Sequence, residues 1–414
     1  MTQNRSMLLI LLMILGILSS CTKAANHTDT ATPAGRTEPA TNSPISVPWL
    51  AMKNTTRINT ADPIQAAVTI SQTLWPSTST SNRTGGVILT EMEDWRSGLA
   101  AADLIHFPFN GPILFATKEQ IPEATLNEIK RLKPEGGGTG KVQVILVGNL
   151  PSKADDQLKS LGLRTERLQA ENAAALANEV DAYFATMQGS LPPAVIVGSM
   201  DQPEYTMPAV NWISHMPEPL LYVKKDEIPT ETITALQKRN GHAKIYILGP
   251  ESVISASVEH QLKAYGTVTR IAGNDPFTNA ISFAKFFDPT ASFGWNITTP
   301  GHNFSFVPEN ANLLAIAAAP FSHLGKHAPL LWTGKDQLPS SVMEYLMALQ
   351  PKYQKSPSEG PYNHGWITGD QGVISINVQG EIDDMLEITS AAAGGEHGGH
   401  ASNYSGSSNP SITR

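Results

Sequence analysis

The sequence contains little cysteine, no dense block of positive charge and, after its first 20 residues, no long apolar run. One cysteine in 414 residues excludes an internal disulfide and a zinc site built from several thiolates. The formal charge is -8 and no run of five Lys or Arg residues occurs, which excludes a nucleic-acid partner, because phosphate binding needs a concentrated cationic surface. The later apolar runs are too short to span a bilayer. With 41% hydrophobic residues, the chain is still apolar enough to form roughly two to four globular domains.

The single cysteine stands at the end of an N-terminal export signal. Residues 7–18 are apolar, and two serines then lead into Cys21. Residues 18–21 (LSSC) resemble the bacterial lipobox, which implies a membrane anchor through acylated Cys21. An ordinary signal peptide with an incidental cysteine is the alternative. We therefore expect a lipoprotein signal peptide at residues 1–20.

Both ends of the remaining chain have the composition of flexible segments. Residues 21–46 are rich in Thr, Ala, Pro and Asn without hydrophobic periodicity, which predicts a tether. Residues 391–414 predict a similar disordered tail. His397 and His400 in this tail can touch a metal ion, but two histidines in a glycine-rich end are more typical of solvated chain.

Between these ends, a proline-led apolar motif occurs three times, at spacings of 107 and 110 residues. Ten residues after each leading proline, a second proline is followed by apolar residues at helical spacing. Each motif therefore predicts a buried strand, a short loop and an amphipathic helix. The copies are Pro112, Ile113, Leu114 and Phe115, then Pro219, Leu220, Leu221 and Tyr222, then Pro329, Leu330, Leu331 and Trp332.

Two further phrases repeat around this motif. An apolar run ends at Gly148, Gly249 and Gly369, as a central parallel strand followed by a tight turn requires. A short phrase with one arginine opens each repeat. Because strands alternate with helices, we predict an α/β protein of three tandem three-layer modules with mainly parallel sheets. The expected modules are residues 47–163, 164–266 and 267–390, the third with surface insertions at residues 288–310 and 353–364.

The order and spacing of these phrases resemble the cell wall binding repeat type 2 family of Gram-positive surface proteins. The resemblance covers about residues 50–390. It implies three pseudo-Rossmann modules packed as an intramolecular trimer, wall attachment through the proline-led strands, and binding of anionic wall polysaccharide. This chain departs from the family because the second arginine of the opening phrase is absent from all three copies. That loss and the negative charge disfavour strong binding of an anionic polymer.

The arginines that remain in the opening phrases are Arg57, Arg167 and Arg270. A guanidinium group presents several donors in a planar fork that suits phosphate or carboxylate, so these residues are candidate polymer contacts. The alternative is that each pairs with an acidic neighbour and fixes a joint between modules. For the proline-led strands, burial in the core is the alternative to a binding role.

The sequence offers no recognisable catalytic constellation. It lacks a Gly-x-Ser-x-Gly elbow, a His-Glu-x-x-His helix and a free thiol nucleophile. The glycine-rich residues 136–141 fail as a phosphate loop, because Glu135 and Val142 stand where Gly and Ser/Thr are needed. We expect no enzymatic activity, no cofactor and no metal. Five histidines scattered among apolar helices and loops are interpreted as structural, namely His106, His215, His302, His323 and His327.

The sequence therefore predicts a non-catalytic lipoprotein on the outer face of the cytoplasmic membrane and in the cell wall. Its expected partners are the membrane, through the lipid, and a wall polysaccharide or secondary wall polymer; a surface protein is the alternative partner. Two other functions stay open. One is a solute-binding lipoprotein of a transporter, which the threefold repeat disfavours. The other is a wall hydrolase with its site in the third module's insertions.

Overall fold

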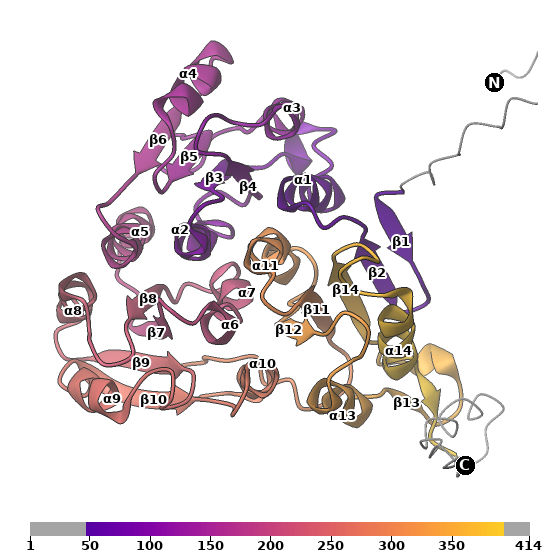
Figure 1. Ribbon diagram of the computed structural model, residues 1–414. Helices are drawn as coiled ribbons and strands as arrows, with labels where there is room; N and C mark the ends of the chain where they lie inside the picture. The colour runs from indigo at the N-terminus through magenta and orange to yellow at the C-terminus, as the bar shows by residue number, and fades with distance from the viewer. Residues whose placement is uncertain (1–46, 393–414) are drawn as a thin grey trace, which may run out of the picture. The chain divides into compact units, whose positions relative to one another are not determined.

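The computed structural model describes residues 47–392, which form three separate sheets of mainly parallel strands flanked by helices (Figure 1). The predicted signal peptide, Cys21, the tether and the two tail histidines lie outside these residues. Within residues 47–392, no helix combines the length and apolar character needed to cross a membrane. The predicted repeated α/β architecture is confirmed.

The first sheet has four parallel strands in the order β4-β3-β5-β6. Strands β4, β3 and β5 are buried along their whole length, as their nearly continuous apolar sequences predict. Its elements are α1 (Pro63–Leu74), η1 (Thr80–Asn82), β3 (Val87–Glu91), α2 (Trp95–Ala101), η2 (Ala102–Leu104), β4 (Ile113–Ala116), α3 (Glu123–Leu132), β5 (Val144–Val147), α4 (Ser152–Ser160) and β6 (Thr165–Leu168).

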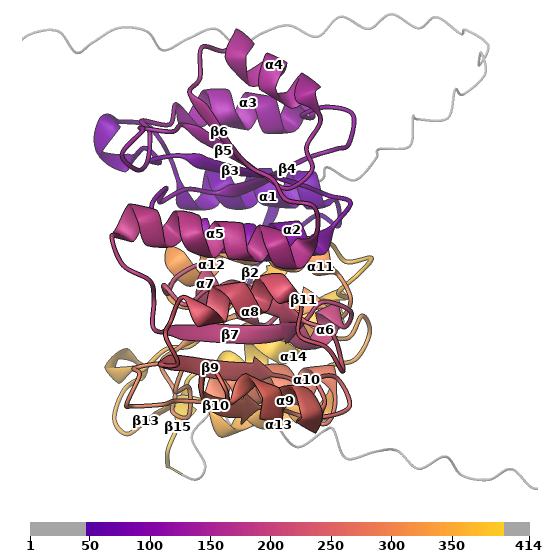
Figure 2. The same cartoon turned by 90° about the vertical axis from the view of Figure 1, so that its left-hand side faces the viewer.

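The second sheet repeats this pattern with the order β8-β7-β9-β10, again all parallel. Figure 2 shows α5 beside α2, and α5 also packs on β8 and α8, so this helix lies between the first and second sheets. The elements are α5 (Ala173–Gln188), β7 (Ala194–Ser199), α6 (Pro203–Thr206), α7 (Ala209–Ile213), β8 (Leu220–Val223), α8 (Thr230–Gln237), β9 (Ala243–Leu248), α9 (Ala256–Leu262) and β10 (Gly266–Ile271).

The third sheet has the order β12-β11-β14-β2-β1, so it combines strands from both ends of the described chain. Only β1 is antiparallel to its neighbour. The elements are β1 (Trp49–Ala51), β2 (Thr55–Ile58), α10 (Pro276–Lys285), β11 (Asn303–Pro308), α11 (Asn312–Ala318), α12 (Pro320–His323), β12 (Leu330–Thr333), α13 (Ser340–Ala348), β14 (His364–Thr368) and α14 (Ile376–Leu386), with a small pair of β13 (Lys352–Tyr353) and β15 (Thr389–Ser390) and the turn η3 (Pro357–Glu359).

Sheet membership is shifted by one strand from the sequence repeats. The opening strand of each repeat, β2, β6 or β10, is the fourth strand of the preceding repeat's sheet. The helix that follows it, α1, α5 or α10, packs on the next sheet. Because β2 pairs with β14, the first and last repeats are joined, and the three repeats close into a ring around α2, α7 and α11 (Figure 1).

The opening phrases contain their own helix start signals. Asp62, Asn172 and Asp275 are the N-cap residues of α1, α5 and α10. Each side chain accepts a hydrogen bond from a backbone amide of the first turn, which satisfies a donor that the helix leaves unpaired. The phrase therefore encodes a strand, a cap and a helix in succession.

One expected surface insertion is part of the core. Residues 288–310 were predicted to be a loop, but they include β11, whose residues from Phe304 to Pro308 are buried. This strand lies between β12 and β14 in the sheet. The prediction is wrong there because the strand is short and its burial is imposed by neighbours distant in sequence. The insertion at residues 353–364 is mainly exposed, as expected.

Candidate functional site

The three opening-phrase arginines occupy one equivalent position in the three sheets. Each pairs in register with the residue two places before the glycine that ends the adjacent strand. These glycines, Gly148, Gly249 and Gly369, all have positive φ, between 103° and 140°, as the predicted tight turn requires. In each sheet the guanidinium group bonds to a carbonyl of this turn and to a side chain of the following helix.

Arg57 is completely buried, and each of its three guanidinium nitrogens donates a hydrogen bond inside the protein. Its Nη1 donates to the carbonyl oxygens of Gly369 at 2.7 Å and Ile374 at 2.8 Å. Its Nε donates to Oε1 of Gln379 at 2.7 Å, and its Nη2 donates to the carbonyl of Ser375 at 3.2 Å. Burial lowers the pKa of Arg57 to about 10. With an exposed fraction of 0%, Arg57 does not reach a polymer outside the protein, which corrects its interpretation as a contact residue.

Arg167 and Arg270 make the corresponding contacts nearer the surface. Arg167 donates to the carbonyl of Leu150 at 2.9 Å and is ion-paired with Asp155 on α4. Arg270 donates to the carbonyl of Gly249 at 2.7 Å and from Nε to Glu259 on α9 at 2.8 Å. Both arginines thus tie the fourth strand to the third, within one sheet. Their predicted role in polymer binding stays a prediction.

The proline-led motifs form the edge strands β4, β8 and β12, and all three strands are buried. The carbonyls of the leading prolines, Pro112, Pro219 and Pro329, accept equivalent hydrogen bonds of 2.9–3.0 Å from the adjacent strands. Because no side chain of these strands lies at the surface, their geometry is that of core strands, which was the alternative interpretation.

The aromatic residue in two of these motifs joins neighbouring repeats. The Tyr222 hydroxyl donates to the carbonyl of Arg96 at 2.8 Å, and Trp332 Nε1 donates to the carbonyl of Glu204 at 2.8 Å. Arg96 lies at the start of α2 and Glu204 at the start of α6, each in the preceding repeat. Phe115 occupies the same position in the first motif but has no polar atom with which to donate. The motif therefore builds joints between repeats.

Buried ionisable groups gather where the first two repeats meet. Arg239 forms a buried ion pair with Asp181, and both carboxylate oxygens of buried Asp103 lack a hydrogen-bond partner. Burial raises the pKa of Asp103 well above its ordinary value, and the charges of Asp181 and Glu218 raise it further. Glu218 precedes the second motif and accepts a hydrogen bond from Trp212 Nε1 at 2.8 Å.

Glu218→Gln should remove a pH dependence of stability. Burial raises the pKa of Glu218 from 4.5 to about 7, although the bond from Trp212 opposes the shift. Between these values the unfolded chain has lost the proton while the folded protein keeps it, so stability falls as the pH rises through the window. We expect the variant to gain up to about 3 kcal/mol over the parent at pH 7.5 and nothing at pH 4. Urea denaturation at both pH values measures this, and parallel profiles would contradict it.

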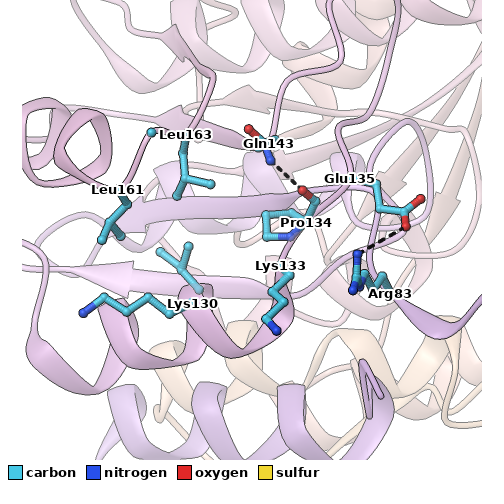
Figure 3. A pocket seen from close by; sticks show the side chains of 10 residues that line it. Arg83, Lys130, Lys133, Pro134, Glu135, Gln143, Leu161 and Leu163 are labelled. Carbon is cyan, nitrogen blue, oxygen red and sulfur yellow. Dashed lines mark hydrogen bonds and ion pairs between the residues drawn. The ribbon is translucent and has the colours of Figure 1, made fainter. Parts of the chain in front are cut away.

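An open pocket of about 490 Å³ lies on the first repeat beside the C-terminal end of α3 (Figure 3). Lys130, Lys133 and Arg83 contribute cationic side chains, and Arg83 lies 3.9 Å from the carboxylate of Glu135. The other lining residues are Ile129, Pro134, Gln143, Leu161, Gly162 and Leu163. Three cations against one carboxylate give this pocket a positive balance on a chain whose overall charge is negative.

The structure brings together three histidines that the sequence analysis treated as scattered. One ring nitrogen from each of His106, His215 and His323 lies within 4.8 Å of the others, a grouping able to hold a metal ion. The description of these three as scattered is therefore wrong, and their interpretation as structural stays a prediction. Each lies between the strand β3, β7 or β11 of its repeat and the proline-led motif, four or six residues before the leading proline, and this shared region was the signal available in the sequence. His302 is not part of the group.

Two solved structures share the repeated arrangement. Cwp6 from Clostridium difficile matches with a TM-score of 0.65 at 20% identity, over 84% of this chain and 50% of that chain. The fold is that of Cwp6. Cwp8 from Clostridium difficile matches with a TM-score of 0.62 at 19% identity, over 81% of this chain and 52% of its own.

Two proteins of Bacillus subtilis (strain 168) are similar in sequence. N-acetylmuramoyl-L-alanine amidase LytC is 25% identical over 242 residues, which are 57% of this chain and 44% of LytC. Amidase enhancer is 28% identical over 167 residues, which are 40% of this chain and 22% of that protein. The matched parts thus cover less than half of either relative. No family model matches the sequence, so the resemblance to the type 2 wall-binding repeat stays a prediction beside the confirmed fold.

Proposed function

We propose that this protein is a non-catalytic surface lipoprotein that associates with cell wall polymers through its three repeats. The observation that carries the proposal is the closed array of three α/β repeats in the fold of Cwp6 and Cwp8. Similarity to the amidase LytC and to amidase enhancer supports a place at the cell wall. Lipid attachment through Cys21 would hold the array at the outer face of the membrane.

The cationic pocket of the first repeat is the proposed subsite for acidic groups of the polymer. Lys130 and Lys133 are exposed, and Figure 3 shows their side chains on the pocket wall formed by the end of α3. Charged nitrogen donors bind phosphate and carboxylate oxygens more strongly than neutral donors do. The corresponding positions after the other two motifs are Gln237 and Asn240, then Met347 and Gln350, so the first repeat differs in charge.

Reversing these charges should release the protein from walls. We expect Lys130→Glu with Lys133→Glu to weaken binding to isolated walls by about tenfold or more, since two attractions of up to ~1 kcal/mol each become repulsions. The bound fraction is measured by co-sedimentation over a range of salt concentrations. Lys225→Glu with Lys263→Glu changes the charge equally at exposed sites of the second repeat and is the matched control.

If both double variants lost wall binding equally, the binding would depend on the net charge of the protein and not on this pocket. Failure of the parent protein to sediment with walls at any salt concentration would contradict the proposed function itself. The same samples also test the alternative of a wall hydrolase, which the similarity to LytC leaves open. If the protein were a wall hydrolase, it would release soluble wall fragments from these samples over time.

A solute-binding role is less well supported. Receptors of that kind place one ligand in a cleft between two lobes, whereas the described residues form three equivalent sheets closed into a ring. A thermal shift with a small solute would favour the receptor role over wall association.

A further inference from the structure

The three clustered histidines come from the same place in each repeat. His106 follows η2, His215 follows α7, and His323 ends α12. His106 and His323 each stand six residues before the leading proline of a motif, and His215 stands four residues before its own. Because the helices of the three repeats pack together inside the ring, one imidazole from each repeat reaches a common point.

The spacing of the rings suits a single small ion. The Nδ1 atoms of His106 and His323 lie 2.9 Å apart. The ring centroids are 4.6 Å apart for His106 and His323 and 5.6 Å apart for His106 and His215. Zn–N bonds of about 2.0–2.1 Å in a tetrahedral site place ligand nitrogens about 3.4 Å from one another. Small side-chain rotations therefore convert the observed grouping, with all nitrogens within 4.8 Å, into a coordination shell.

His323 is oriented as a ligand by a neighbouring amide. Its Nε2 lies 2.8 Å from Oδ1 of Asn110, an atom that only accepts, so Nε2 holds the proton and the lone pair of Nδ1 accepts from Nδ1 of His106. The Asn110 backbone carbonyl is itself held by Trp75 Nε1 at 3.1 Å and Thr84 Oγ1 at 2.9 Å. A carbonyl-type oxygen on the far nitrogen is the usual support of a metal-bound histidine.

His215 has a nitrogen free for an ion, and His106 would exchange its Nδ1 hydrogen bond to His323 for the ion. Nδ1 of His215 is buried and has no hydrogen-bond partner among the described residues. Burial lowers the pKa of His106, and burial together with mutual repulsion lowers the pKa of His215 and His323 to about 4. The repulsion includes exposed His327, whose ring lies 4.1 Å from that of His215. A lower pKa favours the uncharged form of each ring.

We propose that His106, His215 and His323 form a three-histidine site for a divalent transition-metal ion such as Zn²⁺, at the point where the three repeats meet. The ion takes one nitrogen from each ring, and His106 then holds its proton on Nε2, facing solvent. A fourth position is filled by water. Because each ligand belongs to a different repeat, the ion cross-links the ring and stabilises its closed form.

The test is a titration of the metal-free full chain with Co²⁺, followed by competition with Zn²⁺. For the titration, the three histidines of the terminal segments are replaced (His27→Gln, His397→Gln and His400→Gln), so that these segments cannot supply imidazoles. We expect one Co²⁺ per chain with the visible absorption of tetrahedral cobalt, displacement by Zn²⁺, and a higher thermal midpoint with Zn²⁺. His106→Gln and His323→Gln should each weaken binding by more than ~100-fold, and Asn110→Leu by about 10–100-fold.

His260→Gln removes an exposed histidine of α9 and is the control, which should bind as the parent does. His106 is itself exposed, so its variant keeps the fold, and the thermal midpoint without metal checks this. No cobalt spectrum, or equal affinity in the parent and in folded His106→Gln, would overturn the proposal. Neither result depends on wall binding, so this site and the proposed function fail separately.

Discussion

Replacing Arg239 with methionine should lower the free energy of unfolding by about 3–5 kcal/mol, because a buried carboxylate loses its counter-ion. Nη1 and Nη2 of Arg239 donate to the two carboxylate oxygens of Asp181 at 2.9 Å each, and Nε donates to the carbonyl of Pro192 at 2.9 Å. The two side chains are 2% and 1% exposed. Buried Asp103 lies close enough to interact electrostatically with both groups, so the variant leaves two carboxyl groups together without a cation.

Urea denaturation measures this effect, and two variants make it specific. Asp181→Leu combined with Arg239→Met should recover most of the loss, because an apolar pair replaces a buried ion pair at little or no cost. Lys224→Met removes an exposed ion pair with Glu227 and should leave the denaturation midpoint unchanged. A change of less than ~1 kcal/mol for Arg239→Met alone would contradict the assigned role of the pair.

Arg57→Met should destabilise the protein by a similar amount, about 3–5 kcal/mol. The substitution removes the donors for three backbone carbonyls and for Gln379, and each buried acceptor left unpaired costs about 1–3 kcal/mol. These acceptors lie in the turn after β14 and on α14, whereas Arg57 lies on β2. The lost bonds therefore weaken the joint that closes the ring between the first and last repeats. Urea denaturation gives the size of the loss.

The equivalent arginines provide the matched comparison. Arg167→Met and Arg270→Met should cost less, about 1–2 kcal/mol each, because their side chains are 24% and 15% exposed and water replaces part of the lost bonding. Co-sedimentation of both variants with walls tests the predicted role of these two arginines as polymer contacts. Loss of wall binding without loss of stability would identify them as polymer contacts, and equal destabilisation at all three positions would contradict the special role of Arg57.

The local structure of each repeat could be predicted from the sequence. Apolar runs that end in glycine predicted β5, β9 and β14, and the proline-led motifs predicted β4, β8 and β12 with their helices. These signals are local, because burial on both faces of a parallel strand demands a continuous apolar run and a tight turn demands positive φ. The fold class therefore followed from patterns within each repeat.

Contacts between repeats could not be predicted in the same way. The apolar pattern of β2 does not indicate which strand pairs with it, and its partner β14 lies more than 300 residues away. The opening arginines suited either an anion or an internal carboxylate, and only their positions showed that Arg57 is enclosed. The histidine group was missed because each histidine is isolated in its own repeat. Aligning the three copies on their leading prolines would have placed His106 and His323 at the same position and His215 two residues from it.

The most direct test of the proposed function is co-sedimentation of the purified chain with two wall preparations, one complete and one stripped of its secondary polymers. The proposal predicts retention on complete walls and weaker retention on stripped walls. The protein should also bind the isolated secondary polymer when that polymer is immobilised on a support. Equal retention on both preparations would place the contact on peptidoglycan or on another surface component. No retention on either would contradict wall association.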